Sequence, residues 1–265
     1  AARFVSWNER VVAASELFLK DMETVVAEGV KPVYKGGPTQ FEFLRIHLSL
    51  SHFEESAAAE IRRLMPALAV AESRLKPDAE SGAGAVGFLQ MMRSTFEEHG
   101  TGDIYSLENQ LAAADSLFEQ FRRTLENQCQ PLLDKIEALF FNGDHAAFVK
   151  DFYVPCVLSC YNAGPGNVRS VLEGFTHEFF NIDDIHRYLS SNGIAVVEKD
   201  VFALMVQLEK EFDWDPQYGT QSRGYVPKVY AARMALDTDL SQEQRAHFLG
   251  ELPNGSHPAV DTSSG

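Results

Sequence analysis

The sequence lacks the long apolar runs and the clustered basic residues that mark two large classes of protein. None of its stretches reaches the roughly 18 consecutive apolar residues that a membrane-spanning helix requires. The formal net charge is −15 and the lysines and arginines form no stripe, so neither nucleic acid nor an anionic membrane is an expected partner. With 265 residues, 45% of them hydrophobic, the chain is long enough for one large core, with or without an extension.

Cysteine is also scarce. Cys129, Cys156 and Cys160 form neither a disulfide framework nor a metal-binding pattern, and no metal or cofactor is expected. Cys156 and Cys160 lie four residues apart in an expected helix, where they fit the role of small apolar core side chains. Two alternatives stay open: a bridge from Cys129 to one of them if the protein is exported, and a catalytic thiol, although no histidine adjoins them in sequence.

The first residues, "AARFVSWNER", lack the features of a signal peptide. They have no basic start followed by an apolar run, and no methionine. A mature or trimmed chain would begin in the same way, so this end does not decide whether the protein is exported.

Strand signals are scarce as well, and helical spacing of apolar residues dominates the chain. At most a short hairpin is expected, around 80–90. Pro66 and Pro155 fall inside expected helices, where each either kinks the helix or begins a fresh one. Helices are expected over 8–28, 41–51, 53–74, 90–99, 106–126, 131–142, 145–161, 167–174, 181–191, 197–212 and 225–237. We therefore predict a mainly α fold, in which 197–212 is an amphipathic helix.

Glu72 has the clearest chemical signature. Leu68 precedes it by four residues, so both lie on one face of the expected helix, and that face is apolar. A carboxyl in such a place is partly desolvated, which raises its pKa and allows it to donate a proton near neutral pH. The structural alternative is a glutamate that pairs with an arginine at the edge of the core, such as Arg74 or Arg93.

A glycine-rich loop follows Glu72. Gly82, Gly84 and Gly87 allow a positive φ or a close approach of the backbone to a ligand. The loop has neither a GK[ST] sequence nor a GxGxxG sequence between a strand and a helix, so it is not a phosphate-binding loop. Taken alone, it fits a flexible turn.

Three motifs, in a fixed order, place these features in a family. The stretch "ESRLKPDAESGAGAVGFLQMM" (72–92) resembles the first motif of the SLT-type lytic transglycosylases, within the lysozyme-like superfamily. "CYNAGPG" (160–166) and "QSRGYVPK" (221–228) are similar to the second and third motifs. "DIYSLENQLAAA" (103–114) stands where the family has a segment that ends in a helix led by asparagine. The resemblance covers residues 60–238.

The resemblance implies a mainly α catalytic domain of the lysozyme-like (goose-type/SLT) kind, with at most a short β-hairpin. It divides the chain into an N-terminal helical extension (1–55), the catalytic domain (56–240) and a tail (241–265) that we expect to be disordered. The extension would be either a structural cap or the docking element for a protein partner. The implied location is the cell envelope or periplasm, or outside the cell.

The activity implied by the resemblance is cleavage of peptidoglycan glycan strands. Members of the family break the β-1,4 bond between N-acetylmuramic acid and N-acetylglucosamine without water and leave a 1,6-anhydro sugar. Most glycosidases use two carboxylates, whereas this family uses one glutamate, which acts as acid and then as base. That role would fall to Glu72.

Further residues are implied to bind substrate. Ser73 and Gln90 would contact the sugar or orient Glu72, and Tyr161 and Tyr225 would line the cleft. Tyr225 would lie near the glutamate, and both tyrosines have an alternative reading as core residues with satisfied hydroxyls. The implied substrate-binding residues are Ser73, Ser81, Gly87, Gln90, Met91, Tyr161, Asn162 and Tyr225.

Departures from the family pattern keep two other functions open. Arg93 replaces the family's proline, Gln221 replaces its usual glutamate, and the stretch 120–145 looks inserted. A lysozyme-type muramidase, which hydrolyses the same bond, would need a second carboxylate, with Glu97, Glu98 and Asp103 as candidates. A non-catalytic glycan-binding or scaffold module is hinted at only by Gln221. Trp214 could be a sugar platform, but a core position is favoured.

Overall fold

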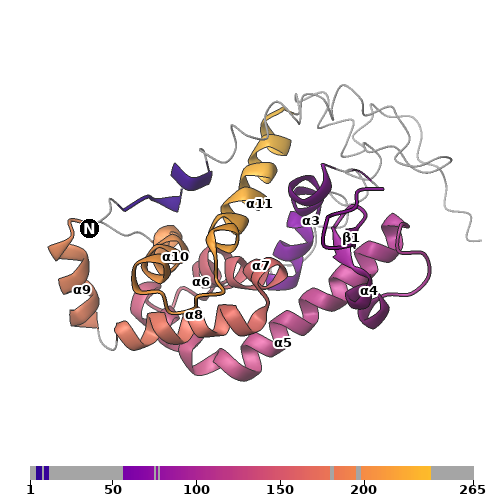
Figure 1. Ribbon diagram of the computed structural model, residues 1–265. Coiled ribbons are helices and arrows are strands. Elements are labelled where there is room, and N and C mark those ends of the chain that lie inside the picture. Colours follow the sequence, from indigo (N-terminus) through magenta and orange to yellow (C-terminus); the bar gives the residue numbers. More distant parts are fainter. Residues whose placement is uncertain are drawn as a thin grey trace, which may run out of the picture.

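The computed structural model describes residues 4–7, 9–11, 56–74, 76, 78–179, 182–194 and 198–239. The expected helix at 41–51, most of the one at 8–28 and the tail lie outside the described residues. The elements are α3 (Ala57–Ser73), β1 (Ala85–Val86), β2 (Met91–Met92), α4 (Arg93–His99), α5 (Leu107–Phe140), α6 (His145–Phe148), the π-helix η1 (Val149–Tyr153), α7 (Val154–Ala163), α8 (Pro165–Glu178), α9 (Ile182–Ser191), the 3-10 helix η2 (Glu198–Asp200), α10 (Val201–Phe212) and α11 (Thr220–Asp239). The prediction of a mainly α fold with one short hairpin is confirmed (Figure 1).

Helix α3 carries Glu72 near its end and is buried along most of its length. The Ser56 hydroxyl accepts a hydrogen bond from the Ala59 N–H, which satisfies one of the free N–H groups at the helix start. The helix runs unbroken past Pro66, so a fresh helix beginning there is ruled out. It ends where Arg74 adopts a left-handed conformation with φ of 57°.

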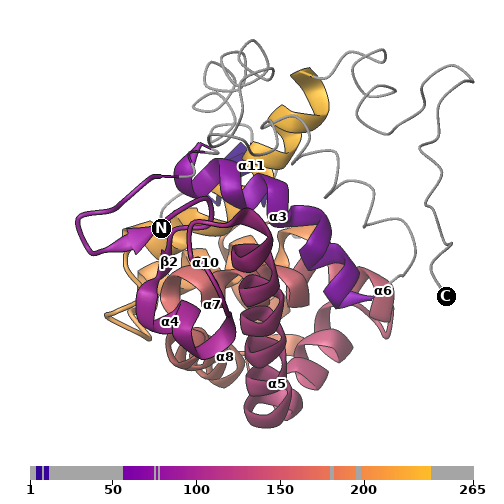
Figure 2. The same cartoon turned by 90° about the vertical axis from the view of Figure 1, so that its right-hand side faces the viewer.

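Helix α5 replaces two expected helices with one of 34 residues. The predicted break before Pro131 is wrong, because the buried stripe continues across it: Leu125, Cys129 and Leu133 follow at intervals of four. Their burial outweighs the local cost of a proline inside a helix. Figures 1 and 2 show α5 as the longest rod of the molecule, with α4 beside its first turns.

The run 145–161 is one continuous helical path, but not a uniform one. Between α6 and α7 the five residues of η1 take the wider π spacing, and the Val154 N–H donates to the Val149 carbonyl. Pro155 follows at once, in the first turn of α7, where its missing N–H cannot continue the ladder of hydrogen bonds.

Helices α10 and α11 complete the body. Helix α10 is buried on all sides from Val201 to Val206, and the predicted amphipathic pattern appears in its second half, where Leu208 is buried and Lys210 and Glu211 are exposed. The last helix begins at Thr220 rather than at residue 225, so the third motif lies on a helix. Helix α11 stands beside α3 in both views (Figures 1 and 2). The Arg233 guanidinium ties the two helices by donating to the Arg63 carbonyl at 2.7 Å.

The described part of the N-terminal segment lies against these last helices. Its Trp7 ring makes edge contacts with Phe202 on α10 and Tyr230 on α11, at centroid distances of 6.0 and 5.1 Å. The Trp7 N–H donates to the buried Asp200 carboxylate at 2.7 Å. Residues 4–7 and 9–11 therefore pack on the body of the protein.

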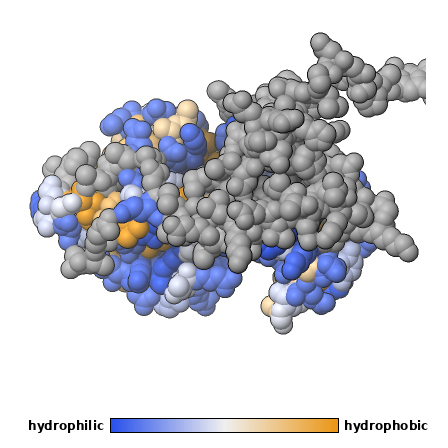
Figure 3. Space-filling view, turned by 90° about the horizontal axis from the view of Figure 1, so that it is seen from above, coloured by the Kyte–Doolittle hydropathy of each residue, from blue (hydrophilic) through white to orange (hydrophobic). Residues whose placement is uncertain are grey.

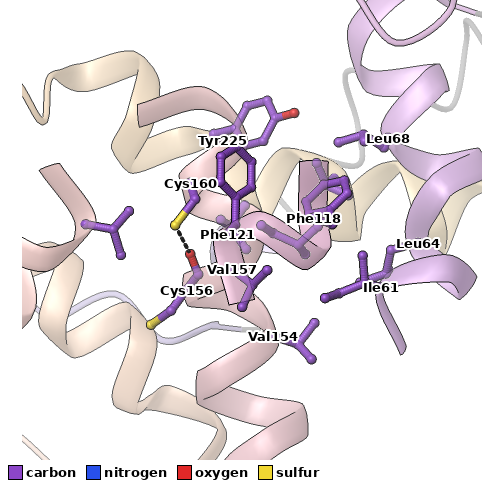
Figure 4. Close-up of a cluster of buried hydrophobic side chains, with 14 of the residues drawn as sticks. Ile61, Leu64, Leu68, Phe118, Phe121, Val154, Cys156, Val157, Cys160 and Tyr225 are labelled. Carbon is purple, nitrogen blue, oxygen red and sulfur yellow. Dashed lines mark hydrogen bonds between the residues drawn. The ribbon is translucent and has the colours of Figure 1, made fainter. Parts of the chain in front are cut away.

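One core joins α3, α5, α7, α8, α10 and α11. Figure 4 shows a part of it, in which Ile61 and Leu64 of α3 face Phe118 and Val157. The described surface seen from above is largely hydrophilic, with small apolar areas (Figure 3). Within the described part of the chain, no helix is long and apolar enough to cross a membrane.

The three cysteines are buried in this core and free of disulfides. Burial raises the pKa of each thiol, because the thiolate would lose its hydration. Their role as small core side chains is confirmed, and the disulfide and the catalytic thiol find no support.

Candidate active site

The centre of the site is a hydrogen bond between Glu72 and Tyr225. The Tyr225 hydroxyl donates to Glu72 Oε1 at 2.5 Å, joining two residues 153 positions apart in sequence. The packing of α11 against α3 brings them together. Tyr225 is only 3% exposed, and in Figure 4 its ring lies over the core with the hydroxyl on the side of α3.

Burial sets the acidity of Glu72. Loss of hydration raises its pKa above the ordinary range, and this effect outweighs the Tyr225 hydrogen bond and the charge of Lys228, which both lower it. Lys228 follows Tyr225 by three residues and so lies on the same side of α11. The Glu72 carboxyl therefore keeps its proton to higher pH than an exposed glutamate does. When it is charged, the Tyr225 hydroxyl and the Lys228 ammonium stabilise it.

The arginines proposed as structural partners of Glu72 bond elsewhere. Arg74 Nη1 donates to the carbonyls of Val70 and Ala71, at the end of α3. Arg93 donates to the Tyr105 hydroxyl at 2.8 Å, and its guanidinium lies 5.6 Å from that ring's centroid. The hydrogen bond of Glu72 is to a phenol.

A two-stranded hairpin follows α3 in sequence, with Val86 paired to Met91 and Ala85 to Met92. Gly87 takes a φ of 78° at the end of β1, and a Cβ added there would lie 1.7 Å from Gln110 Nε2. This position therefore requires glycine on two grounds, conformation and space. Ser81 serves the same loop, since its hydroxyl accepts from the Ala85 N–H at 3.0 Å.

Gln90 sits at the tip of the hairpin in a left-handed conformation, with φ of 50°. Its Nε2 donates to the carbonyls of Ala79 and Gly87, both at 3.0 Å. The side chain thus braces the glycine loop from inside, and it remains partly exposed.

Tyr161 fastens the same hairpin from α7. Its hydroxyl donates to the Leu89 carbonyl at 2.7 Å, and its ring stacks on Phe118 with the planes 17° apart. Burial and the nearby Glu72 charge raise its pKa, so the hydroxyl stays protonated and keeps donating. Tyr161 is therefore a brace that stands close to Glu72.

Ser73, Gly87 and Met91 are expected substrate-binding residues that are buried. Ser73 is buried, its hydroxyl donates to the Ala69 carbonyl, and it accepts from the Lys76 N–H, so it closes the turn after α3. Met91 is 2% exposed and points into the core, whereas its neighbour Met92 is 42% exposed. Successive residues of a strand face opposite sides, which explains why the outward position falls one residue later than expected.

The second and third motifs are joined by a separate contact. Asn162 Oδ1 accepts from the Ser222 hydroxyl at 2.9 Å, linking the end of α7 to the start of α11.

Arg223 donates to the fully buried Glu209 carboxylate, with its Nε 2.5 Å from Oε2. Gln221 is exposed one turn before Tyr225.

The remaining candidates do not join Glu72. The carboxylates proposed for a hydrolase, Glu97, Glu98 and Asp103, are all exposed on or just after α4. Trp214 is half-buried at the edge of the core, where it stacks on the exposed Phe212 and contacts the buried Phe175. Among the described residues, no group of histidine, cysteine and acidic side chains is arranged to hold a metal ion.

Gln110 is the residue that sequence reasoning missed. It is fully buried on the first turn of α5, and its amide bonds three backbone groups of the hairpin and of the segment before α5. Its only sequence signal is a glutamine at the start of the "ENQLAAA" helix, where the neighbouring positions on that face are apolar.

Comparison with known families supplies the last observation. Residues 50–179 match the family described as transglycosylase SLT domain, which includes α3, the hairpin and α5 through α8. Comparison with curated proteins and with solved structures gives no match. The match indicates a peptidoglycan-cleaving, glycosidase-like activity of the lytic transglycosylase type, and Tyr225 lies beyond the matched residues. Residues 50–179 are thus similar to the transglycosylase SLT domain, and the described structure is mainly α, as the lysozyme-like fold of that domain is.

Proposed function

We propose that this protein is a lytic transglycosylase. It would cleave the bond between N-acetylmuramic acid and N-acetylglucosamine in peptidoglycan and close the muramic acid into its 1,6-anhydro form. The observation that carries the proposal is the half-buried carboxyl of Glu72, which accepts a hydrogen bond from the Tyr225 hydroxyl at 2.5 Å and lies in the matched domain.

In the first step Glu72 gives its proton to the glycosidic oxygen. The bond from that oxygen to the anomeric carbon breaks, and the N-acetylglucosamine side leaves as an alcohol. The raised pKa supports this step, because Glu72 then carries a proton at pH values where an exposed glutamate has lost it.

In the second step Glu72, now a carboxylate, takes the proton from the muramyl 6-hydroxyl while that oxygen attacks the anomeric carbon. The new bond closes the 1,6-anhydro ring, and Glu72 regains the proton it gave away. The Tyr225 hydroxyl and the charge of Lys228 stabilise the carboxylate between the two steps, because both lower the pKa of Glu72.

The hairpin would form one wall of the groove that binds the glycan. In the loop before it, Gly82 and Gly84 face open space and would let the backbone pass close to a sugar, and Met92 presents an apolar side chain at the surface. Gln90, Tyr161 and Asn162 would hold or contact the sugar. Excluding water favours the internal hydroxyl over hydrolysis, and holding that hydroxyl near the anomeric carbon raises its effective concentration.

The rest of the chain follows from the same proposal. We assign residues 56–240 to the catalytic domain and residues 1–55 to an N-terminal extension. The extension would serve as a structural cap or as the docking element for a protein partner. The packing of Trp7 on α10 and α11 supports a structural role for the start of that extension. Action on peptidoglycan would place the protein at the cell envelope or outside the cell.

Digestion of purified peptidoglycan, with the products identified by mass spectrometry, tests the proposal. We expect 1,6-anhydromuropeptides from the wild type and a rate at least about 1,000-fold lower from Glu72→Gln. Reducing N-acetylmuramic acid ends would instead identify a muramidase. Binding to insoluble peptidoglycan without any turnover would identify a glycan-binding module, and anhydro products that persist in Glu72→Gln would remove Glu72 from the mechanism.

A further inference from the structure

A buried amide, that of Gln110, is one of the side-chain groups that attach the hairpin to the body of the protein. Gln110 Oε1 accepts from the Leu89 N–H at 3.0 Å. Its Nε2 donates to the Ile104 carbonyl at 2.6 Å and approaches the Val86 carbonyl at 3.3 Å. The three partners are backbone groups on two segments that the chain places on either side of α4.

The Gln110 amide is shielded from water, and the space that it occupies depends on Gly87. Gln110 is 0% exposed, so water does not reach the backbone groups that it satisfies. The absent Cβ of Gly87 makes the space for it, since a Cβ there would lie 1.7 Å from Nε2. Gly87 and Gln110 are therefore a matched pair, one providing the space that the other fills.

The two segments joined by Gln110 carry exposed apolar side chains. Met92 is 42% exposed at the end of β2, and Tyr105 is 39% exposed next to Ile104. Arg93 links them, because it follows Met92 directly and donates to the Tyr105 hydroxyl. Apolar and aromatic side chains of this kind pack against the faces of sugar rings. A shift of either segment would change the spacing between the two side chains.

We propose that Gln110 is a positioning residue for glycan binding: its buried amide sets the position of the hairpin relative to the segment before α5, and with it the spacing of the exposed Met92 and Tyr105 and the partly exposed Gln90. The inference rests on the proposed function and adds a residue that contacts no substrate itself. Its loss therefore affects binding of the glycan more than the chemistry at Glu72.

Substitution of Gln110 by leucine tests the role of the amide. Gln110→Leu keeps the size of the side chain and removes its donor and its acceptor. With soluble glycan strands as substrate, we expect KM to rise about fivefold or more while kcat changes less than about twofold. The pH dependence of kcat should stay that of the wild type, because Glu72 and Tyr225 are untouched.

A second variant gives a signature that a merely structural role would not produce. In Gln110→Glu, a protonated carboxyl can donate to the Ile104 carbonyl and accept from the Leu89 N–H, as the amide does. Burial raises the pKa of this carboxyl, and above that pKa the side chain can no longer donate. The ratio of its KM to the wild-type KM should be near one at acid pH and rise as pH increases.

The control is Thr176→Val on α8, which removes a buried hydroxyl that, like the Gln110 amide, donates to a backbone carbonyl. It should lower the melting temperature without changing KM. A KM ratio for Gln110→Glu that stays constant with pH, or a Gln110→Leu variant with wild-type KM, overturns the inference. Lack of anhydro products from the wild type would contradict the proposed function instead, so the two failures are distinguishable.

Discussion

A half-buried carboxyl and a buried phenol, joined by a hydrogen bond of 2.5 Å, define the site at the scale of single residues. Burial favours the protonated form of Glu72, while Tyr225 and Lys228 favour the charged form. The same environment raises the pKa of Tyr225, so its proton remains on the phenol. The pair therefore has a fixed direction, with tyrosine as donor and glutamate as acceptor.

Because the pKa of Glu72 is raised in the folded protein, ionisation of Glu72 lowers the free energy of unfolding as pH increases. Between the unfolded carboxyl pKa, about 4.3, and the raised folded value, the folded state binds more protons than the unfolded state. Stability is therefore lost as pH rises through this window. Glu72→Gln removes that loss, so its melting temperature should exceed the wild-type value at pH 7 and approach it at pH 4. Thermal unfolding at several pH values checks this, and a difference that does not vary with pH would contradict it.

Removing the Tyr225 hydroxyl should shift the pH profile of the enzyme. The hydrogen bond lowers the pKa of Glu72, so Tyr225→Phe should raise that pKa and move the alkaline limb of kcat to higher pH. The rate at the optimum should fall by about tenfold or more, because the carboxylate formed between the two steps loses a donor. Tyr218→Phe, whose hydroxyl pairs with Ser159 at 2.6 Å, is the matched control and should leave the profile in place.

The hairpin and α5 form one unit at the scale of elements. Two strands of two residues each are too short to be stable alone, and they depend on Gln110 from α5 and Tyr161 from α7 for their attachment. Helix α5 is long enough to contact both α4 near its start and α8. The stretch that looked inserted, 120–145, is mostly the second half of this helix.

Two glycines of the loop should respond differently to alanine. Gly87→Ala meets Gln110 and forces a side chain into a positive φ, so we expect it to lower the free energy of unfolding by about 2 kcal/mol or more. Gly82→Ala faces open space without a positive φ and should change it by less than about 0.5 kcal/mol. Urea unfolding of both variants gives the comparison, and equal losses would refute the steric argument.

Helical spacing predicted most of the described elements because each helix buries one apolar stripe. It failed where a single residue type was taken as a stop signal. Pro131 does not end α5, and Gly224 does not delay α11, because burial of neighbouring residues outweighs the local preference. For the site, the family motif pointed to Glu72 and Tyr225. The outward turn of Met92 and the buried amide of Gln110 depend on strand register and on packing between distant segments, which one sequence does not reveal.

The last helices and the first described residues meet at the scale of the whole molecule. Trp7 contacts α10 and α11, and the Val5 N–H and Arg10 Nη2 both donate to Gln207 Oε1 at 3.2 Å. The helix that carries Tyr225 is thus packed against α3 and held by a segment that begins more than two hundred residues earlier. The N-terminal segment is therefore packed against the last two described helices, α10 and α11.

Loss of the Trp7 ring should weaken the packing of the N-terminal segment on α10 and α11 and destabilise the protein. Trp7→Ala is expected to lower the free energy of unfolding by about 2 kcal/mol, since the half-buried ring fills the space between Phe202 and Tyr230. Phe212→Ala, at a residue that is 41% exposed, should cost less. Denaturant unfolding measures both, and a Trp7→Ala loss no larger than that of Phe212→Ala would mean that the segment contributes little.

The three buried thiols can be used to measure how often the core of the protein opens. Cys129, Cys156 and Cys160 have almost no exposed surface and raised pKa values, so a thiol reagent added to the folded protein should react only when the core opens. The rate of labelling then measures how often α5 and α7 separate, without any added probe. A cysteine introduced on the outer face would react at once, which allows a dye to be attached there while the native three remain unmodified.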